Sequence, residues 1–126
     1  MSRLFVVGNL VRDPEMKFTN SGKAVTKCTI AENYKPREGA EQVTFVDVVL
    51  WDGLGENFNQ FKKGQRVFAE GRLKQSNWET DAGDKRSRLE LIADNAGADC
   101  RYDLVRVEKK STDAPKNAID DTDEPW

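Results

Sequence analysis

The segment from Val43 to Trp51 constrains the fold most, because its side chains alternate as in a strand with two different faces. The two faces carry Val46, Val48 and Leu50 against Phe45, Asp47, Val49 and Trp51. An apolar interior does not hold an unpaired carboxylate, so we expect the valine face to be buried and the rings exposed. Exposed rings in a row suit stacking on unpaired nucleobases. A strand covered on both faces of a sandwich would show the same alternation.

Two later segments repeat this combination of rings with cations. From Arg66 to Trp78 the small and aliphatic residues Val67, Ala69, Gly71 and Leu73 alternate with Phe68, Glu70, Arg72, Lys74, Ser76 and Trp78. The next segment alternates Arg86 and Arg88 with Leu89 and Leu91. Cations that neutralise phosphates, beside an indole that stacks on a base, are the combination that single-strand binders use.

The spacing of the periodic segments predicts an all-β barrel with one short helix. We expect strands over residues 3–11, 23–34, 43–52, 65–78, 86–93 and 101–108. A stripe of Leu54, Phe58 and Phe61 predicts a helix over residues 54–63 that plugs one end of the barrel. Turns are expected at residues 12–15 and 20–22, and residues 81–84 close a long hairpin that can project as a finger.

The charge of the chain separates into two parts. The formal net charge is -2, but residues 111–126 hold one Lys and five acidic residues, which leaves a small cationic excess in residues 1–110. We therefore expect one folded domain over residues 1–108, a short linker over 109–118 and an acidic tip over 119–126. An acidic end of this kind is often only a solubilising segment. Here, however, Pro125 and Trp126 follow the acids directly, which favours a ligand for a basic pocket.

Several other classes of protein are disfavoured by what the sequence lacks. It has no His, no phosphate-binding glycine loop, no metal-ligand spacing and no nucleophile with an evident base, so we expect neither an enzyme nor a cofactor. Cys28 and Cys100 are expected to be reduced and structural. No apolar run approaches the roughly 20 residues of a membrane span, and no export signal is visible, so the expected location is the cytoplasm, in association with the nucleoid.

Several motifs occur together in the order typical of one family. They are Val7-Gly8-Asn9-Leu10, Asp13-Pro14-Glu15, Phe18-Thr19, Ser21-Gly22-Lys23-Ala24-Val25, Glu56-Asn57, Lys62-Lys63-Gly64 and Glu70-Gly71-Arg72-Leu73, followed by the acidic tail. With them the chain resembles the bacterial single-stranded DNA-binding proteins over residues 3–108 and the last seven residues. Residues 71–85 and the pair Arg101-Tyr102 look most like actinobacterial members, or like a copy from a phage of such hosts.

This resemblance implies a five-stranded OB-fold barrel with one short helix, an extra C-terminal strand and a disordered acidic tail. It also implies a homotetramer that binds single-stranded DNA without strong sequence preference, and a tail that recruits replication, recombination and repair proteins. The implied stacking rings are Tyr34, Phe45, Trp51 and Trp78. The implied phosphate contacts are Arg3, Lys27, Arg72, Lys74, Arg86 and Arg88. The implied partner-binding residues are Asp120, Asp121, Asp123, Glu124, Pro125 and Trp126.

Two departures from the family pattern concern the tail. The family ends in Pro-Phe, whereas this chain ends in Pro125-Trp126, and the long spacer common in the family is replaced by a short segment over residues 109–118. A larger terminal ring and a shorter reach are therefore expected to alter partner binding. The alternative function is an OB-like interaction module, such as a primosome component or a subunit whose aromatic face is an oligomer interface.

Overall fold

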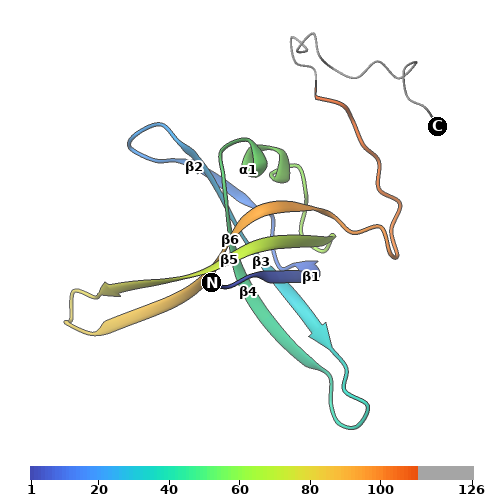
Figure 1. Cartoon of the computed structure of the whole chain (residues 1–126), viewed down its shortest axis with the longest axis horizontal. Helices are drawn as coiled ribbons and strands as arrows, with labels where there is room; N and C mark the ends of the chain where they lie inside the picture. Colours follow the sequence, from blue (N-terminus) through green and yellow to red (C-terminus); the bar gives the residue numbers. More distant parts are fainter. Residues whose placement is uncertain (111–126) are drawn as a thin grey trace.

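The computed structural model of the chain describes residues 1–110, which form one strongly curved sheet and a short helix (Figure 1). The strands are β1 (Leu4–Leu10), β2 (Glu15–Phe18), β3 (Ala24–Tyr34), β4 (Gln42–Trp51), β5 (Arg66–Glu79) and β6 (Lys85–Ala98), and the helix is α1 (Asp52–Phe58). The sequence-based prediction of an all-β, OB-type barrel is confirmed. The tail from residue 111, including the expected partner-binding tip, lies outside the described residues.

The sheet closes on itself into a barrel. Its strand order is β1-β5-β6-β4-β3-β2, and β1 also pairs with β3 through Asn9 and Leu10. The pair β4–β6 is parallel, while the other ladders are antiparallel. At the closure β1 passes very near β3, since a Cβ on Gly8 would lie 2.2 Å from the carbonyl oxygen of Ala31. Only a residue without a side chain allows this approach.

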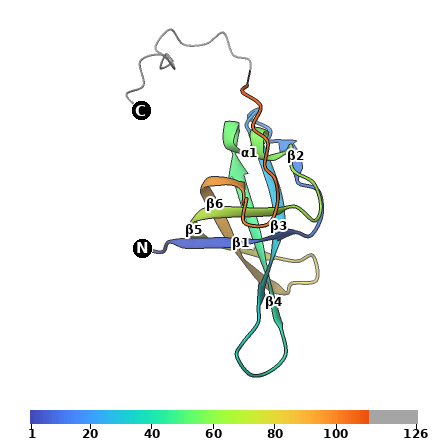
Figure 2. The ribbon, with the colours of Figure 1, turned by 90° about the vertical axis from the view of Figure 1, so that its right-hand side faces the viewer.

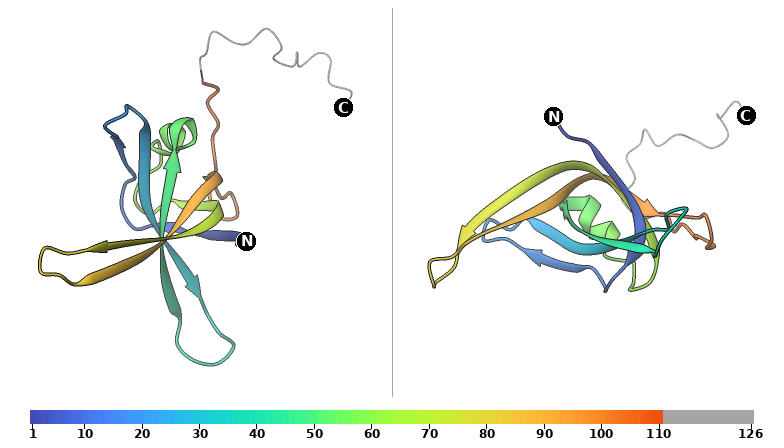
Figure 3. Two further views of the ribbon diagram at one scale, coloured as in Figure 1. Left: turned by 60° about the vertical axis from the view of Figure 1, so that its left-hand side comes forward. Right: turned by 90° about the horizontal axis from the view of Figure 1, so that it is seen from below.

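Aliphatic side chains from every long strand fill the barrel. The core consists of Val6, Leu10, Cys28, Ile30, Val48, Leu50, Phe58, Val67, Ala69, Leu91 and Ala93, with Leu54, Phe61 and Val46 packed against it. Phe58 of α1 is fully buried and meets Phe61 edge to face, with 5.1 Å between ring centroids. The predicted helical stripe therefore faces the core. Seen from below, α1 lies within the curve of the sheet (Figure 3, right).

Two hairpins extend beyond the barrel. The β3–β4 and β5–β6 hairpins diverge from the body in different directions (Figure 2; Figure 3, left). The β3–β4 ladder continues to Tyr34–Gln42, and beyond a register shift between Glu70 and Gly71 the β5–β6 ladder continues to Glu79–Lys85, so each tip is supported by backbone hydrogen bonds. The expected finger around residues 81–84 is thus the tip of β5–β6.

Among residues 1–110, the structure contains no helix with the length and hydrophobicity that crossing a membrane requires.

The elements differ from the prediction in several places. No strand was predicted at β2, which begins at Glu15 where the sequence suggested a turn. Helix α1 ends at Phe58 rather than at residue 63, and β6 continues to Ala98 rather than ending at residue 93. The extra strand expected over residues 101–108 is not present: residues 101–103 form a turn and a bend, and residues 104–110 have no regular secondary structure. An alternating segment becomes a strand only where it can pair with the edge of a sheet, and residues 104–110 pair with no strand in residues 1–110.

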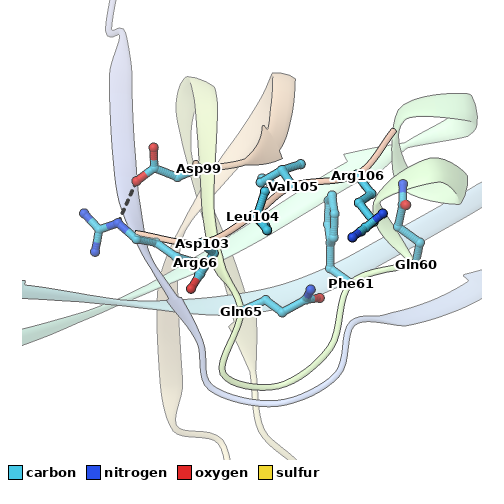
Figure 4. A pocket seen from close by; sticks show the side chains of 10 residues that line it. Gln60, Phe61, Gln65, Arg66, Asp99, Asp103, Leu104, Val105 and Arg106 are labelled. Atoms are coloured by element: carbon cyan, nitrogen blue, oxygen red, sulfur yellow. Dashed lines mark hydrogen bonds and ion pairs between the residues drawn. The ribbon is translucent and has the colours of Figure 1, made fainter. Parts of the chain in front are cut away.

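This C-terminal segment instead runs past one end of the barrel, where a pocket of about 270 Å³ lies between it and Gln60 and Phe61, which follow α1 (Figure 4). Arg66 lines the pocket, donates to Asp99 at 2.6 Å and lies over the ring of Tyr102 at 5.2 Å. Leu104 and Val107 remain exposed. The Arg66–Asp99 contact therefore holds the C-terminal end of β6 against the N-terminal end of β5.

Candidate nucleic-acid interface

Strand register places the predicted binding residues of four strands on one continuous surface, named here the outer face. Val49 lies opposite Lys27 of β3 and Ile92 of β6, and Ile92 lies opposite Arg72 of β5. Residues that lie opposite each other in a ladder point to the same side of a sheet. The outer face comprises Val25, Lys27, Thr29 and Ala31 of β3, Phe45, Asp47, Val49 and Trp51 of β4, Arg72, Lys74, Ser76 and Trp78 of β5, and Arg86, Arg88, Glu90 and Ile92 of β6.

Three rings of the outer face are accessible to a ligand. Phe45, Trp51 and Trp78 have exposed fractions of 65%, 39% and 45%, whereas Val48 and Leu50 on the other face of β4 are buried. The rings are therefore not covered by a second sheet within residues 1–110, which excludes the sandwich alternative for this strand. A partly exposed indole retains a free π surface while its remaining contacts fix its orientation.

The rings are accompanied by five exposed cations. Lys27, Arg72, Lys74, Arg86 and Arg88 all lie on the outer face, in agreement with the alternation of the sequence. Beside Trp51 the surface is hollowed into a groove of about 280 Å³ lined by Lys27, Lys74 and Glu90. Val49 forms its floor and is only 4% exposed, although the sequence placed it with the exposed residues. Side chains from β3, β5 and β6 line the same groove around it.

Asp47 is the acidic group at the centre of the outer face. Its Oδ1 accepts a hydrogen bond from the Thr29 hydroxyl at 2.8 Å, and its Oδ2 lies 3.9 Å from Nε of Arg88. The guanidinium carbon of Arg88 in turn lies 5.7 Å from the ring centroid of Trp78. The second acid, Glu90, accepts from the Ser76 hydroxyl at 3.2 Å. The positive surface is thus interrupted by two carboxylates, each held by a hydroxyl group.

Two of the predicted binding residues lie apart from this arrangement. Ala31 faces Phe45 in the β3–β4 ladder, so Tyr34, three residues further along β3, points to the opposite side of the hairpin. Tyr34 is exposed there, but it does not share a surface with the other three rings. Arg3 is engaged by carboxylates, since it donates to Glu70 at 2.9 Å and also to Asp94. These two acids raise the pKa of Arg3 above its usual value, Asp94 contributing most.

The structure also adds residues that the sequence reading missed. In β2, Glu15 lies opposite Lys27 and Lys17 lies opposite Val25, which extends the outer face by one strand. A groove of about 260 Å³ lies here, lined by Lys17, Lys27 and the exposed ring of Phe18. The alternation of Met16 and Phe18 with Lys17 carries this signal, but the sequence analysis predicted a turn over residues 12–15 and assigned residues 16–18 to no strand.

The described residues offer no evident centre for metal or thiol chemistry. Among residues 1–110, no three His, Cys, Asp or Glu side chains gather as metal ligands would. Burial raises the pKa of the Cys28 thiol to about 12, with a further contribution from the charge of Asp47. The thiol of Cys28 is therefore protonated at neutral pH, and Cys100 is exposed and unpaired with it. The interactions that the outer face offers are aromatic stacking and ion pairing.

A closed β-barrel that presents rings and cations on one face is the architecture of a nucleic-acid-binding OB domain. Comparison with known sequences agrees with this class, and the chain belongs to the single-strand binding protein family, whose sequence model matches residues 1–99. The expected resemblance to this family is confirmed. The family description names a binding activity and not a catalysed reaction, in agreement with the expectation that the chain is not an enzyme.

Curated relatives include actinobacterial proteins. The single-stranded DNA-binding protein of Paenarthrobacter nicotinovorans is 38% identical over 119 residues, which cover 89% of this chain and 70% of the relative. The single-stranded DNA-binding protein of Mycobacterium leprae is 37% identical, over 84% of this chain and 67% of the relative. The protein of that name from Deinococcus radiodurans is 39% identical over 77% of this chain, but the match spans only 36% of that longer relative.

Proposed function

We propose that this chain binds single-stranded DNA without reading its sequence, by stacking bases on the rings of the outer face and pairing phosphates with its cations. The observation that carries the proposal is the register that brings Phe45, Trp51 and Trp78 onto one surface with five exposed Lys and Arg side chains. The names of the relatives support it. Stacking and phosphate contacts are available on any unpaired strand, whereas duplex bases are already stacked.

A titration of tryptophan fluorescence with oligo-dT and with duplex DNA tests this proposal. We expect strong quenching by oligo-dT and little by duplex. Because Trp51 and Trp78 offer partly exposed indoles, Trp51→Ala or Trp78→Ala should each weaken oligo-dT binding by about 1–3 kcal/mol. Tyr102→Ala is the matched control, since Tyr102 is an exposed ring at the barrel end and outside the outer face.

The electrostatic part of the proposal is tested by salt. Arg72→Ala should remove roughly one phosphate contact and reduce the slope of log affinity against log salt by about 0.7. Arg106→Ala removes the same charge beside the pocket at the barrel end and should leave the slope unchanged. If Trp51→Ala and the parent protein bind oligo-dT equally while both remain folded, the stacking surface is wrong. If the tryptophans instead become buried with rising protein concentration in the absence of DNA, the outer face is an oligomer interface.

We also propose a domain over residues 1–108, a linker over 109–118 and a partner-binding tip over 119–126. Cytoplasmic location and roles in replication, recombination and repair are part of the same proposal. The composition of residues 111–126, with one Lys and five acidic residues before Trp126, supports the division of the chain. Such a segment can compete with DNA for the cations of the outer face and bind partner proteins through its terminal ring.

Two truncations separate these roles of the tail. Removal of Asp120–Trp126 should raise affinity for oligo-dT at low salt, because four of the tail's acids are lost. Removal of Pro125–Trp126 alone keeps those acids and should leave DNA affinity unchanged, while it abolishes binding of proteins that recognise the terminal ring. Equal DNA affinity of the parent and the longer truncation would disprove the competition.

A further inference from the structure

Asp47 places a negative carboxylate on a surface that we propose to bind phosphates, which are also negative. It lies on the central strand of the outer face, opposite Thr29 of β3, with the cation of β3 on one side of this strand and the cations of β5 and β6 on the other. Its orientation is fixed by Thr29, which is 7% exposed and whose hydroxyl donates to it at 2.8 Å. Arg12 donates to the same hydroxyl oxygen at 3.4 Å, so the hydroxyl's own hydrogen remains directed to Asp47.

Asp47 also fixes a neighbour that matters for binding. Oδ2 of Asp47 lies 3.9 Å from Nε of Arg88, and the Arg88 guanidinium lies over the ring of Trp78, 5.7 Å from its centroid. Arg88 therefore covers part of the indole face on which a base would stack. Its charge is at the same time directed to a carboxylate of the protein and not to a phosphate. Both functions of this corner of the outer face depend on where Arg88 lies.

We propose that Asp47 is an internal competitor for the ligand: it holds Arg88 against Trp78 in the free protein and has to release it when single-stranded DNA binds. The inference rests on the function proposed above and adds to it a residue that weakens binding. Both side chains of the pair are about half exposed, 41% for Asp47 and 52% for Arg88, so the pair is screened by solvent. Its disruption should accordingly change affinity by about two- to fivefold and not by orders of magnitude.

The test is Asp47→Asn, which removes the charge but keeps the side-chain shape and an oxygen that accepts from Thr29. We expect about two- to fivefold tighter binding of oligo-dT at low salt. The slope of log affinity against log salt should become steeper by up to about 0.7, because the variant has no freed carboxylate that takes up salt cations when Arg88 pairs with a phosphate. In a background of Trp51→Phe and Trp126→Phe, the emission of Trp78 in the free protein should change as Arg88 leaves its ring.

A double-mutant cycle tests whether Asp47 weakens DNA binding through Arg88. In an Arg88→Gln background, Asp47→Asn should give no further gain, since nothing remains for Asp47 to hold. A gain of the same size in that background would show that Asp47 merely repels phosphates, and the proposed coupling would be wrong. Asp103→Asn is the matched control, because it makes the same change in net charge at the pocket at the barrel end and should not tighten binding.

The two proposals fail in different ways. A parent protein that does not bind oligo-dT at low salt contradicts the proposed function itself. A parent that binds, together with Asp47→Asn at equal or lower affinity and with an unchanged urea midpoint, contradicts only the role of Asp47. If Asp47→Asn lowers the urea midpoint, Thr29→Val serves as the second variant, since it frees the carboxylate without removing its charge and should give a smaller gain through the same Arg88.

Discussion

Cys28 and Cys100 have the same side chain in opposite environments, and their chemistry should differ accordingly. Cys28 is 3% exposed within the barrel, and burial raises its pKa to about 12, whereas Cys100 is exposed beyond the end of β6. A thiolate is the reactive form, so a buried, protonated thiol is inert. In the native protein at pH 8, we expect Ellman's reagent to titrate one thiol rapidly.

The control for this prediction is Cys100→Ser, which should abolish the rapid reaction, while unfolding the parent in urea should expose both thiols. Rapid labelling of two thiols in the native parent would mean that the barrel opens far more often than its packing indicates.

The pKa of Cys28 also makes stability depend on pH. In the unfolded chain the thiol ionises above about pH 9, but in the folded protein it keeps its proton up to about pH 12. The unfolded state therefore binds fewer protons in this window, and the free energy of unfolding falls as pH rises, by up to about 1.4 kcal/mol per pH unit from this group. Urea midpoints at pH 8 and pH 10 measure the fall, and it should be smaller in Cys28→Ala.

Among the secondary-structure elements, helix α1 packs very closely against the barrel at Gly55. A Cβ on Gly55 would lie 2.4 Å from the carbonyl oxygen of Leu50 and 2.8 Å from Oγ1 of Thr26. The obstacle is backbone, which cannot rotate away, so Gly55→Ala should displace the helix. We expect Gly55→Ala to lower the free energy of unfolding by about 1–3 kcal/mol in urea denaturation.

Gly53 is the matched control in the same helix. A Cβ on Gly53 meets no atom within 4 Å, so Gly53→Ala should be neutral or stabilise the protein by up to about 1 kcal/mol through helix propensity. If Gly55→Ala and Gly53→Ala are equally stable, the close packing of α1 against β3 and β4 is wrong.

Alternation along a strand was sufficient to predict the elements that bury one face. Val48 and Leu50 are buried opposite the rings of β4, and Phe58 lies in the core, as the sequence indicated. Prediction failed where structure depends on distant partners. The segment 101–108 alternates like a strand, yet it pairs with no sheet edge in the part of the chain that the structure describes. Strand β2 is short and gains its order from pairing with β3.

The same reason limits what the sequence says about the site. Alternation places the rings of Phe45, Trp51 and Trp78 outward, and the register confirms that they share a face. The contacts of Asp47 with Thr29 and Arg88 join the β3–β4 hairpin to β6, which is distant in sequence, and no local pattern encodes them. Likewise, Arg3 looks like any exposed cation in the sequence, but the fold brings Glu70 and Asp94 to it.

At the scale of the whole molecule, β1 leaves an edge open. In the described part of the chain it pairs with β5 along Leu4–Asn9, but with β3 only at Asn9 and Leu10. Phe5 stacks on Phe68, with 5.8 Å between ring centroids, and remains 59% exposed beside this edge. An open strand edge next to exposed rings favours addition of a second copy. These features support the homotetramer implied by the family, which stays a proposal.

Light scattering tests the oligomer, with a monomer mass of 14.3 kDa as the reference. We expect the parent to have a multiple of this mass and Phe5→Glu to shift the protein toward the monomer, because two like charges would meet at the joined edges. Leu104→Glu changes an exposed aliphatic residue outside the sheet and should have no effect. A parent with monomeric mass at micromolar concentration would exclude assembly through this edge.

The closing ladder of the barrel also determines when the protein can fold during its synthesis. Register sets Val6 opposite Ala69, so β1 leaves the ribosome more than sixty residues before its β5 partner. At about 5–20 residues per second, β1 waits on the order of several seconds for this partner. Meanwhile β3 and β4 can already form their local hairpin. Until β5 emerges, a nascent chain therefore exposes Val6 and Leu10, which the finished barrel buries.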